Sequence, residues 1–126
     1  MKENTPSGKK QAGLRKEYFG GGNLSSVGRY VDGKKTGLWK FYFRSGTLRA
    51  VGRFSDGLFT GLWKWNRVNG KPLQIGRFRN GRQEGSWKRY QKDGRLYDIG
   101  RYSDGKKTGA WKTFDSSGKL SRTKRY

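Results

Sequence analysis

Apolar and aromatic residues return along this chain with a fixed step of 24 residues. One column of the pattern is tryptophan, a second is Tyr or Phe, and a third is Val or Ile. Their members are Trp39, Trp63, Trp87 and Trp111; Tyr30, Phe54, Phe78, Tyr102 and Tyr126; and Val27, Val51, Ile75 and Ile99. Self-similarity at a period of about 20 to 50 residues is the signature of a repeat architecture. The pattern predicts five tandem copies, at residues 13–36, 37–60, 61–84, 85–108 and 109–126.

Each copy contains two β-rich runs separated by glycine turns. In the second copy the runs are residues 38–43 and 48–54, with turns at 45–46 and 56–57. Val, Phe, Trp and Tyr favour strands, and Asp-Gly or Asn-Gly pairs favour tight hairpin turns because glycine tolerates a positive φ. Glycine recurs too often for a long helix. We therefore predict an all-β protein, an elongated single layer of antiparallel β-hairpins.

A lone hairpin is only marginally stable, so the copies are expected to stack edge to edge and share one core. At about 4.8 Å per strand, five copies give a sheet about 45 to 50 Å long. We assign the tryptophan column to this core because large rings must supply most of its apolar area. Arg15 replaces Trp in the first copy and Lys124 replaces Gly in the last, which predicts polar ends. Pro72 predicts a bulge in the third copy.

Composition alone would fit a disordered chain, since only 30% of residues are hydrophobic and the net charge is +21. The positions of the glycines argue against disorder. Eighteen of the 21 glycines fall in four columns of the 24-residue pattern. A disordered tract has no reason to keep such a register. Only residues 1–12 are expected to form a polar, flexible N-terminal tail.

The excess of 30 Lys and Arg over nine Asp and Glu predicts a partner of opposite charge. A nucleic acid, an acidic protein and an anionic membrane all carry suitable charge. We rank them in that order and expect no small-molecule substrate. A net charge of +21 makes copies of the chain repel one another, which favours a monomer.

Ten of the cations are periodic, and they form two columns. One follows the tryptophan position and the other precedes the second aromatic. The columns are Lys16, Lys40, Lys64, Lys88 and Lys112, and Arg29, Arg53, Arg77, Arg101 and Arg125. Strand alternation places Arg49, Val51 and Arg53 on one face, and Lys40 on the face opposite Trp39. If both columns share a surface, they form a ladder with rungs about 10 Å apart, suited to a polyanion.

Aromatic rings alternate with the lysines on the same strand and could stack on unpaired bases. These candidates are Tyr18, Tyr42, Tyr90 and Phe114. Two simpler interpretations stay open. The rings could belong to the core, with lysine stems covering apolar surface. The arginines could pack internally on Trp or Tyr as cation–π partners instead of contacting a ligand.

Several kinds of chemistry have no residues to support them in this sequence. It contains no cysteine and no histidine, so we expect no disulfide, no metal site and no cofactor. The carboxylates fall mostly in turns, which disfavours an acid–base pair, and no phosphate-binding glycine loop precedes a helix. We therefore expect no enzyme activity. The start lacks a signal-peptide pattern and no run of 18 apolar residues occurs, so a cytoplasmic location is the default expectation.

The motif Gly-x-Trp-Lys-x-Tyr, followed by Gly-x-Leu and Gly-x-Tyr-x-x-Gly-Lys, resembles the MORN repeat in its bacterial variant form. Residues 37–42 and 85–90 match the first half, and residues 94–96 and 100–106 match the second. The resemblance implies extended β-hairpins, a scaffolding or binding role and no catalytic residues. Similar bacterial proteins are described as YwqK-type antitoxins, and other MORN proteins are linked to lipid or protein contacts. The strong positive charge here departs from what neutralising a basic toxin would require.

Three functions therefore compete at this point. The first is sequence-independent binding of a nucleic acid or another polyanion. The second is an antitoxin or immunity protein that neutralises a toxin by protein–protein binding. The third is attachment to an anionic membrane. All three agree on a non-catalytic scaffold whose basic surface meets an acidic partner.

Overall fold

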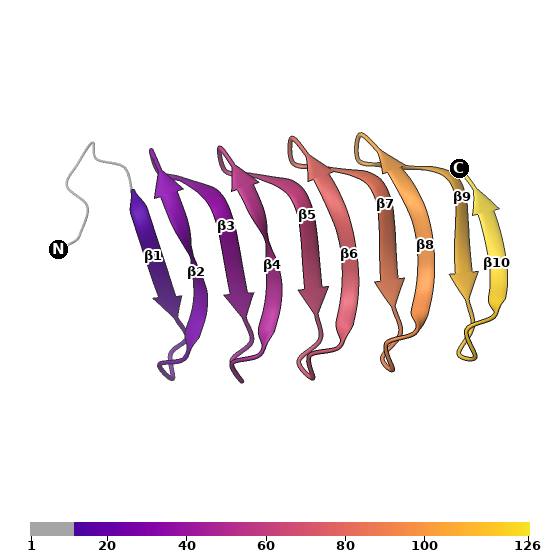
Figure 1. Cartoon of the computed structure of the whole chain (residues 1–126), viewed down its shortest axis with the longest axis horizontal. Helices are drawn as coiled ribbons and strands as arrows, with labels where there is room; N and C mark the ends of the chain where they lie inside the picture. Colours follow the sequence, from indigo (N-terminus) through magenta and orange to yellow (C-terminus); the bar gives the residue numbers. More distant parts are fainter. Residues whose placement is uncertain (1–11) are drawn as a thin grey trace.

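In the computed structural model, which describes residues 12–126, ten β-strands form one open antiparallel sheet (Figure 1). Each strand is hydrogen-bonded to the next in chain order. The strands are β1 (Gly13–Tyr18), β2 (Leu24–Val31), β3 (Lys34–Tyr42), β4 (Leu48–Ser55), β5 (Leu58–Asn66), β6 (Pro72–Arg79), β7 (Arg82–Tyr90), β8 (Leu96–Ser103), β9 (Lys106–Phe114) and β10 (Leu120–Arg125). The predicted all-β array of hairpins is confirmed. The predicted tail, apart from Ala12, lies outside the described residues.

Two kinds of turn join the strands, one kind at each end of the strands. In the tight turn after β2, both Asp32 and Gly33 have positive φ, at 51° and 77°. This is the mirror-image turn whose twist matches that of flanking strands, and Asp, Asn and Gly are the residues that tolerate it. At the other end a longer loop closes when the Phe43 amide donates to the Thr47 carbonyl at 2.8 Å. The same two turns recur through the sheet, so each copy repeats one geometry.

The core lies on one face and is built from a single repeated contact. The Trp39 ring on β3 covers Gly28 on β2 so closely that a Cβ at Gly28 would lie 2.0 Å from it. The Trp39 Nε1 donates a hydrogen bond to the Arg29 carbonyl at 3.1 Å. The same contact recurs for Trp63 over Gly52, Trp87 over Gly76 and Trp111 over Gly100. The four tryptophans are only 1 to 7% exposed. The tryptophan and glycine columns are therefore two halves of one contact between successive copies.

A bulge directs each tryptophan onto the preceding strand. Between β2 and β3, Val27 pairs with Lys40 but Arg29 already pairs with Thr36, so the ladder is interrupted around Gly37. Gly37 has φ of 67°, in the left-handed region that glycine adopts without strain. Bulges re-aim side chains in this way. The glycines chosen as copy boundaries consequently lie inside strands, not between them.

The two edge strands lack this contact, which explains their unusual residues. A tryptophan needs a glycine on the preceding strand, and β1 has no preceding strand within the described sheet. Arg15 stands in the tryptophan column there. On β10, Lys124 stands in the glycine column, where no tryptophan covers it. Cations at these positions also discourage further edge-to-edge pairing.

The irregularity predicted for Pro72 is present but is not special to the third copy. The register between β5 and β6 shifts after Trp65, where Asn66 pairs with Pro72. The same shift occurs after Phe41 and after Arg89 in the neighbouring copies. Pro72 is tolerated because it is the first residue of its strand.

This second bulge also corrects one face assignment. Arg49 was expected beside Arg53 by simple alternation. It instead lines a hollow together with Phe41 and Trp63, on the tryptophan face. The extra residue in the bulged strand reverses the alternation at that point.

Candidate functional site

The five periodic lysines lie on the face opposite the tryptophan rings. Lys40 is paired across the ladder with Val27 on one side and Val51 on the other. The same register continues through the sheet, so a straight row crosses all ten strands and alternates lysine with β-branched residues. Its members are Lys16, Val27, Lys40, Val51, Lys64, Ile75, Lys88, Ile99, Lys112 and Thr123.

The five periodic arginines form a second row on the same face. Arg53 is two residues beyond Val51 on β4 and is paired with Leu38 and with Thr60. Arg29 lines one shallow hollow together with Lys40, which places the two columns side by side. All ten cations are exposed. We call this surface the basic face, defined by Lys16, Lys40, Lys64, Lys88, Lys112, Arg29, Arg53, Arg77, Arg101 and Arg125.

None of these ten side chains has an ion-pair or cation–π partner within residues 12–126. The ion pairs of that part of the chain use Lys34, Arg82, Arg89 and Arg95. The cations placed over tryptophan rings are Lys35 and Lys107. Sequence reasoning missed both, although they occupy one position of the 24-residue pattern. The arginine column therefore points to solvent and not into the aromatic core.

Negative charge is scarce around the basic face. Of the eight acidic residues in the described chain, five lie at the turns and loops, namely Asp32, Asp56, Asp93, Asp104 and Asp115. Only Glu84 is paired with a member of the arginine row, Arg77. Its Oε1 accepts a hydrogen bond from the Asp104 amide at 3.1 Å, which ties it to a turn. The summed field over this face is positive.

Shallow hollows repeat along the basic face at the glycines. One of about 250 Å³ is lined by Val27, Gly28, Arg29 and Lys40. A second of about 240 Å³ is formed by the residues 48 positions later, including Arg77 and Lys88. Each hollow combines an ammonium, a guanidinium and an apolar floor where glycine contributes no side chain. The same combination of groups therefore recurs at two places on the basic face.

The predicted stacking rings lie along the same surface. Tyr90 lines the second hollow beside Lys88. Tyr18 is 60% exposed, and Tyr42, Tyr90 and Phe114 are half-buried. No ring–ring contact in residues 12–126 involves any of these four, whereas the rings of the opposite face form a continuous series with centroids 4.5 to 6.5 Å apart.

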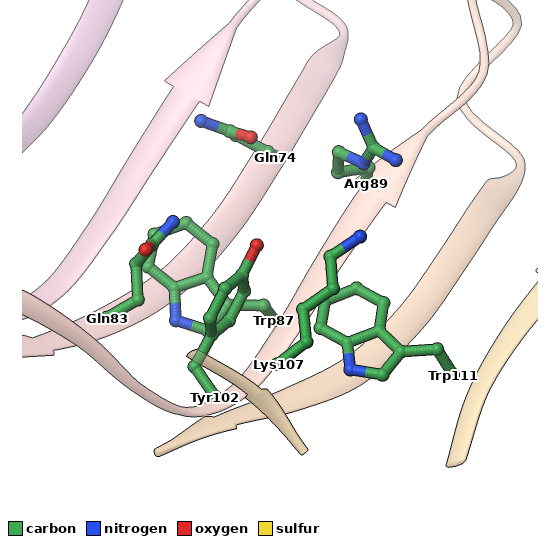
Figure 2. A pocket seen from close by; sticks show the side chains of 7 residues that line it. All are labelled: Gln74, Gln83, Trp87, Arg89, Tyr102, Lys107 and Trp111. Carbon is green, nitrogen blue, oxygen red and sulfur yellow. The ribbon is translucent and has the colours of Figure 1, made fainter. Parts of the chain in front are cut away.

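The opposite face, which we call the aromatic face, has two unlike regions. Towards the N-terminal half, Phe41, Phe54, Phe59 and Trp65 line a largely apolar hollow of about 590 Å³. Towards the C-terminal half there is a smaller hollow of about 140 Å³, with Trp87 and Trp111 as its walls (Figure 2). Its other lining residues are polar or carry a hydroxyl: Gln74, Gln83, Arg89, Tyr102 and Lys107. We call it the polar hollow.

One ion pair joins a half-exposed arginine that lines the polar hollow to a buried carboxylate. Arg89 on β7 donates to Asp98 on β8, with Nη2 to Oδ2 at 2.6 Å and Nε to Oδ1 at 3.1 Å. Asp98 is only 5% exposed. The hydrogen bonds to Asp98 raise the pKa of the Arg89 guanidinium, so it stays charged at every ordinary pH.

Three of the described carboxylates are held in ion pairs. Asp93, Asp98 and Asp104 each accept from a different arginine. Over residues 12–126, no three His, Cys, Asp or Glu side chains come together as a metal site. The same residues include no helix with the length and hydropathy needed to cross a membrane.

Comparison with known families matches two segments of this sheet. Residues 35–56 and residues 107–126 fit the model of the MORN repeat variant. The second segment begins three 24-residue steps after the first, so both start at one position of the repeat. No curated protein matches the chain. The same columns, turns and Trp–Gly contacts run through the copies between the matched segments, so the whole sheet is similar to an array of MORN repeats of the variant form.

Proposed function

We propose that this protein is a non-catalytic scaffold that binds nucleic acid along its basic face. One observation carries the proposal. Ten exposed cations form two rows across the sheet, and none has an ion-pair or cation–π partner among the described residues. Such rows repel one another until an external polyanion neutralises them.

The geometry suits a phosphate backbone that crosses the β-strands. Two strands per copy advance the sheet by about 10 Å, so each copy offers one Lys and one Arg at that interval. Contacts to phosphates release condensed counterions and carry no sequence information. Half-buried Tyr42 and Tyr90 beside the lysine row supply surfaces on which unpaired bases stack. The expected behaviour is strong, salt-dependent binding with little sequence preference.

The test is the affinity for fluorescein-labelled single-stranded DNA, single-stranded RNA and duplex DNA, measured by anisotropy across a salt series from about 50 mM. A triple variant, Lys40→Gln, Lys64→Gln and Lys88→Gln, removes three cations from the lysine row. A matched variant, Lys71→Gln, Lys92→Gln and Lys119→Gln, removes the same charge from exposed positions in loops.

We expect the row variant to weaken binding to every sequence. The slope of log K against log salt should become shallower by up to about 2 to 3 units, because each lost phosphate contact removes about 0.7 to 0.9. The loop variant should change the affinity and the salt slope much less. Equal losses would show that bulk charge, not the row, governs binding. If the unmodified protein binds no nucleic acid at about 50 mM salt, the proposal is wrong and an acidic protein partner, as for an antitoxin, takes its place.

A further inference from the structure

We propose that the polar hollow is a binding site for a small anion, a carboxylate or phosphate group. It lies on the aromatic face and is independent of nucleic-acid binding on the basic face. The inference rests on three observations. They are the places where the repeat is broken, the polar groups left without partners, and the size of the space.

The repeat provides an internal standard for which residues folding requires. Most columns of the aromatic face hold rings or small residues in the second copy, and this suffices for the packing seen there. Around the polar hollow, four of these columns instead hold hydrogen-bond donors or cations, of which Tyr102 and Lys107 also recur in their columns as Tyr30 and Lys35. The changes are Gln74 for Ala50, Arg89 for Phe41, Tyr102 for Phe54, and Gln83 and Lys107 for Phe59. These five side chains come from four different strands and converge on one space.

The converging groups have little to bind within the protein. The side chains of Gln74, Gln83 and Tyr102 make no hydrogen bond to any other residue in 12–126. Lys107 has no carboxylate partner there, and its Nζ lies 4.7 Å from the ring centroid of Trp111. Arg89 bonds Asp98 through Nε and Nη2 only. Figure 2 shows the two cations on one side of the hollow and the two carboxamides on the other.

These groups define the chemistry of the ligand. An ammonium, a guanidinium, two carboxamides and a phenol can all donate, and no carboxylate lines the space. Charge-assisted hydrogen bonds to an anionic oxygen are the strongest that such a set can make. A volume of about 140 Å³ holds about five heavy atoms at the packing of liquid water, the size of a carboxylate or a phosphate. The indoles of Trp87 and Trp111 add flat apolar walls.

The chain also contains a matched control. Lys35 occupies the same column as Lys107 and likewise lies over a tryptophan, with Nζ 5.2 Å from the Trp39 ring centroid. Its hollow, however, is lined mainly by apolar residues; the further polar side chains there are Arg49 and Asn66, and the Asn66 amide already donates to the Leu48 carbonyl. Lys35→Gln and Lys107→Gln therefore remove the same charge and the same cation–π contact, but only Lys107 belongs to the polar hollow.

The experiment uses the five indole N–H signals in ¹H–¹⁵N spectra of the full chain. Inorganic phosphate and benzoate are titrated separately at constant ionic strength. We expect saturable shifts of the Trp87 and Trp111 signals, while those of Trp39 and Trp63 stay in place. Lys107→Gln should weaken binding about tenfold, the effect of one lost charged contact, and Lys35→Gln should leave it unchanged.

The two probes separate the sources of an anionic group. Tighter binding of phosphate assigns the site to a phosphate, and tighter binding of benzoate assigns it to an aromatic carboxylate held between the indoles. The proposal is overturned if neither probe saturates, if all five indoles shift together, or if the two lysine variants lose affinity equally. Unchanged spectra of the free variants would show that both remain folded.

Discussion

The two faces of this sheet are equally periodic, but only one of them is explained by folding. On the aromatic face each Trp covers a Gly of the preceding copy so closely that a Cβ at that Gly would collide with the ring. On the basic face the Lys and Arg rows keep the same 24-residue step with no side-chain partner among residues 12–126 to fix their identity. This periodicity, which packing does not require, supports the proposed polyanion partner.

The aromatic face shows how a protein with few aliphatic residues can fold as a single layer. Its core is not a space between two layers but a row of indoles pressed flat on glycines. That arrangement buries large rings against backbone and leaves the other face of the same strands free. The free face can then carry a charge density that a buried face could not tolerate.

The largest expected effect comes from breaking the aromatic face. Trp63→Ala removes a ring that is 1% exposed and leaves a cavity over Gly52. We expect a loss of about 3 to 5 kcal/mol in the free energy of unfolding, enough to lower Tm by about 10 to 20 °C. Thermal unfolding followed by circular dichroism measures this change.

A ring on the other face is the control for that experiment. Tyr42→Ala removes a half-buried ring on the same sheet that makes no ring–ring contact. This substitution should lower the free energy of unfolding by only about 1 kcal/mol. If the two variants lose the same stability, the core is not confined to the aromatic face and the contrast between the faces fails.

A smaller effect tests the contrast within the aromatic face. Where the second copy has Phe41 across from Ala50, the fourth has Arg89 across from Asp98. Arg89 is half-exposed while the Asp98 side chain is 7% exposed. Arg89→Phe should therefore cost about 2 to 3 kcal/mol by leaving a buried carboxylate unpaired, and Asp98→Ala should cost less than about 1 kcal/mol.

The double variant Arg89→Phe with Asp98→Ala recreates the apolar pair of the second copy. We expect it to regain nearly all the stability that Arg89→Phe loses, because no buried charge remains. Chemical denaturation of the four proteins gives the coupling energy. Simple additivity of the two single losses would mean that the two copies differ by more than this one pair.

The regular part of the molecule could be predicted from the sequence because it repeats. Alternation along a strand of known register placed the Trp, Lys and Arg columns, and the Asp-Gly pairs located the tight turns. The alternation could not show that the Trp39 ring packs on Gly28, because the bulge at Gly37 decides which neighbouring strand the ring covers. The same kind of bulge reversed the face expected for Arg49.

The polar hollow was beyond sequence reasoning for a different reason. Gln74 lies in the third copy and Arg89 and Lys107 in the fourth, at three different positions of the repeat. Gln74 and Arg89 look like isolated departures from their columns, and Lys107 repeats Lys35 of a distant copy. The pairing register of β6 to β9 brings these residues together. Predicting the polar hollow would have required both the exceptions to the repeat pattern and the pairing of the strands.

The smallest expected effect lies outside both faces, in the loop between β9 and β10. A hydrogen bond from the Ser117 hydroxyl, at 2.7 Å, lowers the pKa of the Asp115 carboxyl, and the Lys119 amide acts in the same direction. A group whose pKa is lowered by folding stabilises the fold above its unfolded pKa, and that contribution is lost as the pH falls through the folded pKa. Acid should therefore loosen this hairpin below the ordinary value of 3.8. The amide signals of Ser117 and Lys119 should titrate with a midpoint below 3.8, and Ser117→Ala should move that midpoint up towards it. The same midpoint in both proteins would show that the hydroxyl does not hold the charged carboxylate, and the loop would then be set by backbone geometry alone.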